Sequence, residues 1–257
     1  MSDYLRSLFN LDGKVALITG GSSGIGFGIT EALARAGAAV VLVARTQSGL
    51  DDAVAALTKV GGRAAAISAD LSSRADVARV CDTAADHFGE PDILVCAAGV
   101  NPRPPLAELT TEDWDLALEV NTTAPFLLGQ RFGSRMAERG YGRIINIASQ
   151  QAVRAFGNSG GYGVSKAAIC GLTRSQAEAW SASGVCCNAI SPAFVHTPLT
   201  AAAVAIPGRS EQMAARTMIG RNSQPEDFAG MAVFLAGPAS SYVTGQTLFV
   251  DGGFSVS

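Results

Sequence analysis

A tyrosine and a lysine one helical turn apart, Tyr162 and Lys166, form the chemically most informative pair in this sequence. If Tyr162 lies near the start of a helix, this spacing places both side chains on one face. A free phenol has a pKa of about 10, which a neighbouring cation would lower. Ser149, upstream in the chain, offers a hydroxyl to hold a carbonyl or alcohol oxygen. The three groups predict a general acid/base site, although Tyr and Lys at this spacing also occur by chance on solvated helices.

A glycine-rich turn follows the first predicted strand. Residues 14–18 (KVALI) form a short, mostly apolar run, residues 19–26 read TGGSSGIG, and an apolar-periodic stretch then runs to Gly37. Strand, glycine turn and helix in this order favour a dinucleotide, because the backbone can approach a pyrophosphate and the helix N-terminus offers free N–H groups. The spacing is G-x-x-x-G-x-G rather than the G-x-G-x-x-G of the standard fingerprint. The candidate contacts are Gly20, Ser22, Ser23, Gly24, Ile25 and Gly26.

The second predicted strand, residues 39–43, is followed by Arg45. An acidic residue at this place would bind the ribose 2′-hydroxyl of NAD, but the stretch contains no Asp or Glu. A guanidinium suits a 2′-phosphate. The sequence therefore favours NADP(H) over NAD(H), with a surface arginine at a strand end as the alternative interpretation.

Length and composition predict one large α/β domain. The chain has 257 residues, of which 48% are hydrophobic and 16% charged, and predicted strands alternate with helices without a linker or repeat. Continuous apolar strands separated by helices form a parallel sheet covered on both faces. We therefore expect residues 1–257 to form a single doubly wound Rossmann-type domain with about seven strands.

Charge and composition argue against several classes of protein. The net charge is −3 and no long Lys/Arg run is present, so nothing indicates a nucleic-acid partner. No segment approaches the ~18 consecutive apolar residues that span a membrane, and residues 1–14 lack the apolar region of a signal peptide. The five cysteines are scattered and form no metal or disulfide pattern. We expect a cytoplasmic protein without a bound metal, acting on a small molecule.

The segment 197–225 is long and Ala-rich and follows a predicted strand end. We interpret it as a mobile lid over the site, with an inserted pair of surface helices as the alternative. Arg103 and Arg154 are the candidate substrate contacts. A bidentate arginine would suit a carboxylate.

The order and spacing of these motifs resemble the short-chain dehydrogenase/reductase superfamily over essentially the whole chain. The matching residues are Thr19-Gly20-x-x-x-Gly24-x-Gly26, Asp70-Leu71, Ala97-Ala98-Gly99, Asn121, Ser149, Tyr162 with Lys166, Pro192 with Thr197, and Asp251-Gly252-Gly253. The segments Leu8–Lys14 and Gly99–Leu106 look most like gluconate 5-dehydrogenase-type members.

The resemblance implies catalytic roles for four residues. Tyr162 would be the proton donor and acceptor, and Lys166 would hold the nicotinamide ribose and lower the pKa of the tyrosine. Ser149 would orient the substrate oxygen. Asn121 resembles the family residue whose helix irregularity supports a water-linked proton relay to the lysine.

The resemblance also implies the remaining cofactor contacts. Asp70 and Leu71 match the pair that contacts the adenine, and Thr197 with the backbone at Val195 matches the segment that binds the carboxamide. Further contacts of this kind are implied at Ala98, Gly99 and Pro192. A homotetramer or dimer is implied, built through helices within 110–139 and 162–181 and the C-terminal segment.

Two positions depart from the family pattern. Cys96 and Ala97 stand where the family usually has two asparagines, and Ala193 follows Pro192 where glycine is usual. Cysteine hydrogen-bonds less well than an amide, so we expect a slightly weaker local scaffold with an intact cofactor site. The alanine predicts that position 193 does not need a positive φ.

Taken together, the residues predict an NAD(P)(H)-dependent oxidoreductase that interconverts a ketone and a secondary alcohol. Its substrate would be a sugar acid or another small polar carbonyl compound. A 3-oxoacyl-thioester reductase and a broad ketone reductase stay open. The alternative from another class is a nucleotide-binding regulatory protein that keeps the fold without catalysis.

Overall fold

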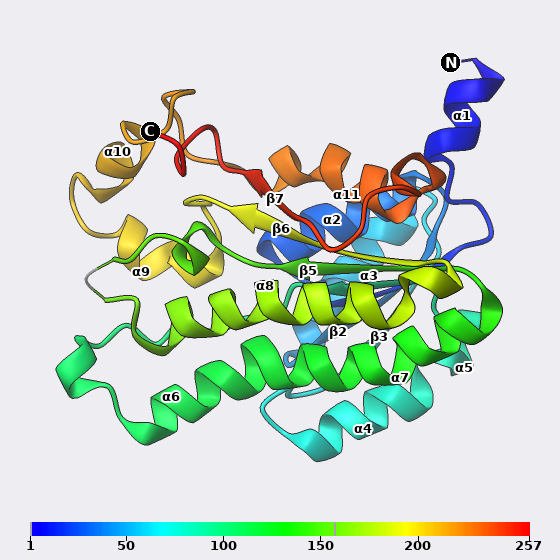
Figure 1. Ribbon diagram of the computed structural model, residues 1–257, viewed down its shortest axis with the longest axis horizontal. Coiled ribbons are helices and arrows are strands. Elements are labelled where there is room, and N and C mark those ends of the chain that lie inside the picture. The colour runs from blue at the N-terminus through cyan, green and yellow to red at the C-terminus, as the bar shows by residue number, and fades with distance from the viewer. Residues whose placement is uncertain (1, 157) are drawn as a thin grey trace.

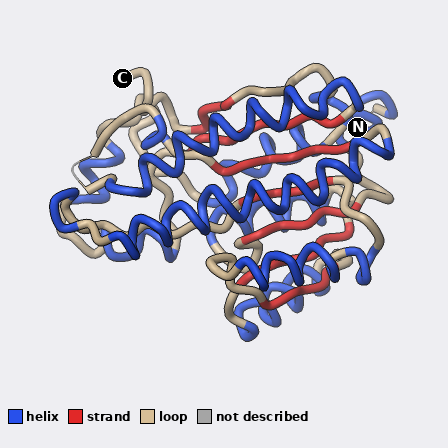
Figure 2. The backbone as a smooth tube through the Cα atoms, turned by 60° about the horizontal axis from the view of Figure 1, so that its bottom comes forward, coloured by secondary structure: helices blue, strands red, loops and turns tan. Residues whose placement is uncertain are grey.

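The computed structural model describes residues 2–156 and 158–257. Its centre is a seven-stranded, all-parallel sheet with the order β3-β2-β1-β4-β5-β6-β7 (Figures 1 and 2). The strands are β1 (Val15–Thr19), β2 (Ala39–Ala44), β3 (Ala64–Ser68), β4 (Ile93–Cys96), β5 (Gly142–Ile147), β6 (Val185–Pro192) and β7 (Thr247–Val250). The strand order reverses between β1 and β4, and ligands of such sheets bind at that crevice beyond the strand carboxyl ends.

Helices cover both faces of the sheet (Figure 2). One face carries α2 (Gly24–Arg35), α3 (Gln47–Lys59) and α11 (Ala229–Ala236), and the other carries α4 (Arg74–Thr83), α7 (Ala124–Arg139) and α8 (Gly160–Trp180). Each face encloses its own core, which is why the strands read as continuous apolar runs. The remaining helices are α1 (Asp3–Phe9), α5 (Ala85–Phe88), α6 (Thr111–Leu118), α9 (Ala201–Val204) and α10 (Arg209–Ala214). The predicted doubly wound fold is confirmed.

Local signals account for the ends of several elements. Thr110 caps α6 by accepting a hydrogen bond from the N–H of Asp113 at its hydroxyl. A π-helical turn, Glu119–Thr123, joins α6 to α7. The helices α4 and α5 follow each other closely and are separated at Ala84.

The predicted lid, residues 197–225, contains short helices rather than a long pair. The 3₁₀ turn Pro198–Thr200 leads into α9 and then α10, which lie at one end of the molecule beside the start of α8 (Figure 1). That this segment closes over the site stays a prediction. Within the described residues, no helix has both the length and the apolar character needed to cross a membrane.

Candidate active site

Tyr162 and Lys166 lie on the buried face of the first turns of α8. Their side chains are 8% and 4% exposed, and the Lys166 Nζ lies 5.7 Å from the centroid of the Tyr162 ring. Ser149 lies two residues beyond the end of β5, and its Oγ accepts a hydrogen bond from the N–H of Gln151. The strand end and the helix start thus bring the three predicted groups to one place.

The expected lowering of the Tyr162 pKa is wrong for this structure. Burial raises the pKa of the phenol above its usual range, while the Ser149 hydroxyl and the Arg103 guanidinium oppose the rise. Lys166 instead donates from Nζ to the carbonyl oxygen of Ile147 at 2.6 Å, so its charge is directed at the backbone of β5. Sequence spacing placed the two residues on one face but could not give the direction of the ammonium group.

Burial also shifts Lys166 itself. It lowers the pKa of this lysine to about 8, and the thiols of Cys96 and Cys170 oppose the shift. A lysine with a pKa near neutrality can gain and lose a proton during turnover. This property fits the relay role that the family resemblance implies.

Asn121 lies in the π-helical turn between α6 and α7. Its Nδ2 donates to the carbonyl oxygen of Val100 (2.9 Å) and to the Ser165 Oγ (3.0 Å), and its Oδ1 accepts from the N–H of Val100. Asn121 therefore ties the loop after β4 to α8. Such π-turns are frequent at functional sites, but a water-linked relay through Asn121 stays a prediction.

The glycine turn between β1 and α2 leaves an open cradle. A Cβ at Gly20 would lie 2.8 Å from the backbone nitrogen of Ala98, and one at Gly26 would overlap the Gly20 carbonyl. Gly20 and Gly24 also have positive φ values of +67° and +53°, which favour glycine. Ser23 caps α2 without a side-chain hydrogen bond, so the first N–H groups of the helix face the cradle. This cradle fits the pyrophosphate of a dinucleotide.

Two adjoining cavities extend this cradle along the sheet edge. The Arg45 cavity (about 220 Å³) and the Lys166 cavity (about 180 Å³) share Gly20, Ser23, Ala98 and Gly99. The first also contains Ser22, Arg45, Asp70 and Leu71, and the second also contains Gly24, Ile25, Gly26, Tyr162, Lys166, Pro192, Val195 and Thr197. Every sequence-predicted cofactor residue thus lines this continuous track. The sequence analysis missed Thr46 and Thr200, which no motif singles out.

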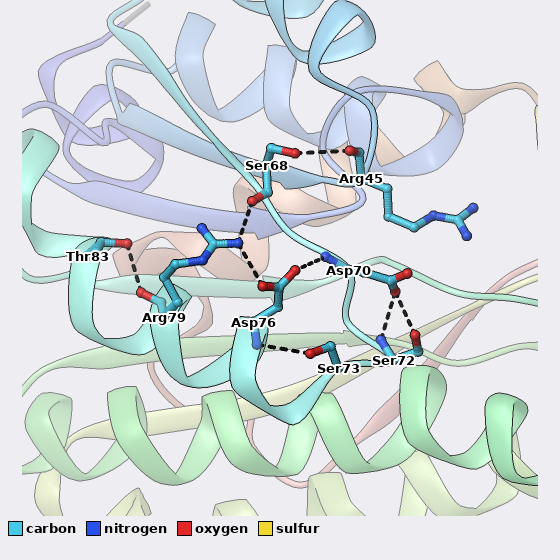
Figure 3. A network of polar contacts seen from close by, with 8 residues as sticks. All are labelled: Arg45, Ser68, Asp70, Ser72, Ser73, Asp76, Arg79 and Thr83. Carbon is cyan, nitrogen blue, oxygen red and sulfur yellow. Dashed lines mark hydrogen bonds and ion pairs between the residues drawn. The ribbon is translucent and has the colours of Figure 1, made fainter.

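Arg45 and Asp70 differ in how firmly they are held (Figure 3). The N–H of Asp70 donates to the Asp76 carboxylate, and the Asp70 Oδ1 accepts from both the N–H and the hydroxyl of Ser72. The Arg45 side chain extends away from this network, and its guanidinium meets no hydrogen-bond partner among the described residues. Asp70 is therefore preorganised, while Arg45 keeps its donors for a ligand.

The two departures from the family pattern leave the backbone intact. The Thr19 Oγ1 accepts from the N–H groups of Ala97 (3.1 Å) and Ala98 (3.2 Å), so a hydroxyl ties β1 to the loop after β4. No described residue other than glycine has a positive φ, which confirms that Ala193 does not need one. A weaker scaffold at Cys96 stays a prediction.

A third and larger cavity, of about 860 Å³, opens beside Ser149 and Tyr162. We call it the Arg103 cavity, since this predicted substrate residue lies in its wall. Arg154 is not among the lining residues. Its guanidinium donates to the carbonyl oxygens of Ser255 and Ser257 and so fastens the C-terminal residues. The prediction that Arg154 contacts substrate is therefore corrected to a structural role.

We expect Arg154→Ala to lower the free energy of unfolding by about 1–2 kcal/mol, because three charge-assisted hydrogen bonds are lost. Urea unfolding measures this loss, and Arg154→Lys should recover part of it. Relative rates on acidic and neutral substrates should not change. An unaltered midpoint combined with a lost preference for acids would return Arg154 to the substrate site.

Comparison with known proteins agrees with this geometry. The family model described as enoyl-(acyl carrier protein) reductase matches residues 20–255. The chain belongs to the short-chain dehydrogenase/reductase family. It is accordingly an oxidoreductase that interconverts a ketone and a secondary alcohol by hydride transfer with a nicotinamide cofactor.

Three similar proteins cover nearly the whole chain. It is 38% identical to gluconate 5-dehydrogenase of Gluconobacter oxydans, over 97% of this chain and 98% of that protein. It is 39% identical to cis-4-hydroxycyclohexanecarboxylate dehydrogenase of Sinomonas cyclohexanicum, over 94% and 96%. The crystal structure of a Burkholderia cenocepacia gluconate 5-dehydrogenase in complex with NADP and tartrate superposes with a TM-score of 0.93 at 35% identity, covering 98% and 99%.

Proposed function

We propose that this protein is an NADP(H)-preferring dehydrogenase of a small hydroxy acid, such as a sugar acid, with Ser149, Tyr162 and Lys166 as its catalytic residues. One observation carries the proposal. Ser149 and Tyr162 belong both to the wall of the Lys166 cavity and to that of the Arg103 cavity. The acid/base group therefore stands where a cofactor track and a substrate cavity meet.

The roles of the residues follow from this placement. The bound nicotinamide supplies or accepts the hydride. Ser149 holds the substrate oxygen, and the Tyr162 phenol donates a proton to that oxygen during reduction and accepts it during oxidation. Burial keeps the phenol protonated, as reduction requires. Lys166, beside it on α8, holds the nicotinamide ribose and replaces the proton of Tyr162.

The names of similar proteins support an acidic substrate. Gluconate, a cyclohexanecarboxylate and tartrate all carry a carboxylate, and they appear in the names of two relatives and one structural neighbour. The guanidinium of Arg103 in the cavity wall offers this group a partner.

Absorbance at 340 nm tests the proposal directly. NADPH and NADH are each mixed with the protein and with ketones, oxidised sugar acids and acyl thioesters. Oxidation of NADPH by an oxidised sugar acid is the expected result. Faster turnover of an acyl thioester would favour the thioester reductase instead. Cofactor binding without oxidation of NADPH or reduction of NADP⁺ across keto and hydroxy acids would favour a regulatory protein.

The preference for NADP(H) rests on Arg45. Its guanidinium lines the Arg45 cavity and meets no partner in the described part of the chain, so it is available to a 2′-phosphate. We expect Arg45→Asp to weaken NADPH binding by about 10–100-fold, since a charge-assisted contact is lost and replaced by repulsion, and to leave NADH binding equal or tighter. Fluorescence titration of both cofactors measures the ratio. An unchanged ratio would contradict the assignment of Arg45.

Exposed apolar side chains and the state of the cysteines bear on the oligomeric state and the cellular location of the protein. We infer a homotetramer or dimer built through α6, α7, α8 and the C-terminal segment. The apolar side chains of Phe126 on α7 and Val164 on α8 are exposed. Sedimentation as a monomer would contradict it. All five cysteines are free, which fits the reducing conditions of the cytoplasm.

A further inference from the structure

The Arg103 cavity contains a second cation that no sequence motif indicated. Arg209, the first residue of α10, lines the same cavity as Arg103, although 106 positions separate them in the chain. The other polar residues of the wall are hydroxyl and amide side chains. Among the described residues that line the cavity, none is Asp or Glu. The cavity therefore presents positive charge without an internal counter-charge.

Neither guanidinium is neutralised by the protein. Within the described chain no ion pair involves Arg103 or Arg209. The Arg209 guanidinium donates only to the side-chain oxygen of Gln212 (2.8 Å) among the described residues. The Arg103 guanidinium donates to the amide oxygen of Asn101 at 3.3 Å when that amide is turned to accept. Both residues are half-buried, so an anion between them would be partly shielded from water.

The two guanidinium groups also lie close enough to influence each other. Burial lowers the pKa of Arg103, Arg209 lowers it further, and the Tyr162 phenol opposes the shift. Arg103 thus lies within electrostatic range of both the acid/base group and Arg209. A substrate whose reacting carbon lies at Tyr162 therefore occupies the same cavity as both arginines.

Contacts across the lid fix the position of Arg209. The next residue, Ser210, shares a hydrogen bond of 3.0 Å with the His196 ring and accepts two from the Asn222 amide, one at its carbonyl and one at its hydroxyl. His196 itself adjoins Thr197 in the wall of the Lys166 cavity. Residues at both ends of the lid therefore hold the start of α10, and with it the backbone from which the Arg209 side chain extends.

The side chains of Gln150 and Gln151 also line the Arg103 cavity. Their Oε1 atoms are buried, with almost no accessible surface, and accept no hydrogen bond from the described residues. Gln150 is only 4% exposed. The two amides add no charge to the wall, so Arg103 and Arg209 provide the charge of the described lining.

We propose that Arg209 is a specificity-determining residue that holds, together with Arg103, the carboxylate of a hydroxy acid. This inference rests on the proposed function and deepens it, because it assigns the acidic end of the substrate to named residues. Two forked guanidinium groups can each bind a carboxylate bidentately. Neutral polyols of the same length lack that group and gain nothing from Arg209.

Paired ligands test the proposal on the protein saturated with NADPH, because a hydroxy acid forms a dead-end complex with the reduced cofactor and is not oxidised during the measurement. The pairs are D-gluconate with D-glucitol, and cis-4-hydroxycyclohexanecarboxylate with its carboxamide. Calorimetry gives the dissociation constants of wild type, Arg209→Gln, Arg209→Lys and Glu211→Gln. Glu211 is exposed on the same helix and does not line the cavity, so its variant is the matched control.

We expect Arg209→Gln to weaken binding of at least one acid by about 10–100-fold, as the loss of a charge-assisted contact implies. The dissociation constant of the neutral ligand of the same pair should change less than about twofold. Arg209→Lys should recover part of the lost affinity for the acid, and Glu211→Gln should bind both ligands as wild type does. Equal binding of acids and neutral partners by wild type would overturn the proposal. Equal losses of affinity for the acid and its neutral partner in Arg209→Gln would also overturn the proposal.

The outcome is separable from that of the proposed function. If NADPH is oxidised by neutral ketones as fast as by keto acids, with no effect of Arg209→Gln, the enzyme assignment stands and the specificity assignment fails. If no carbonyl compound oxidises NADPH but acids still bind through Arg209, the proposed function fails and the anion site stands.

Discussion

We expect the Tyr162→Phe variant to bind NADPH as wild type does and to reduce its substrate about 10³-fold more slowly, within the range of general acid/base catalysis. Phenylalanine keeps the ring that forms the cavity wall and removes only the phenolic oxygen. Of the described residues shared by the Lys166 and Arg103 cavities, Tyr162 has the only side chain that titrates. Pre-steady-state oxidation of NADPH under saturating substrate measures the chemical step directly.

Tyr141→Phe is the matched control. Its hydroxyl donates to the carbonyl oxygen of Ala236, away from all three cavities, so the same atom is removed without touching the site. Its turnover should equal that of wild type. A Tyr162→Phe variant with more than about a tenth of wild-type activity would end the assignment of Tyr162 as the proton donor.

The sequence predicted best those features that depend on local spacing. Tyr162 and Lys166 meet because they are one turn apart on α8, and the glycine turn meets α2 because both belong to one strand–turn–helix unit. The continuous apolar strands likewise required a sheet buried on both faces. In these cases the periodicity of the backbone determines which side chains are neighbours.

Features that depend on the path of long connections could not be predicted in this way. Arg154 follows Ser149 closely, yet its side chain turns to the carbonyl oxygens of the C-terminal residues. Arg209 lines the Arg103 cavity although it lies in the 197–225 segment, and no spacing rule relates it to Arg103. The direction of a long side chain is decided by the acceptors within its reach, which only the tertiary structure supplies.

We expect Lys166→Met to abolish most activity and yet to stabilise the protein in the absence of cofactor. Lys166 is 4% exposed, and burial lowers its pKa from 10.5 to about 8, so the folded protein carries the cost of a charge held out of water. Methionine fills a similar volume without a charge. The Ile147 carbonyl loses its donor, which offsets part of the gain. The net increase in unfolding free energy at pH 7 should be about 1–3 kcal/mol.

The stabilisation by Lys166→Met should decrease as the pH rises. Between pH 8 and 10.5 the unfolded wild-type chain binds more protons at this lysine than the folded protein does, so the contribution of Lys166 to wild-type stability rises with pH across that interval. The advantage of Lys166→Met should therefore be largest below about pH 8 and vanish near 10.5. Urea unfolding at several pH values measures it, and Lys59→Met, which changes an exposed lysine, should show no such dependence. If the difference in unfolding free energy between Lys166→Met and wild type stays constant with pH, the stabilisation comes from packing rather than from removal of the buried charge. In that case the charge of Lys166 does not lower the stability of the wild-type protein.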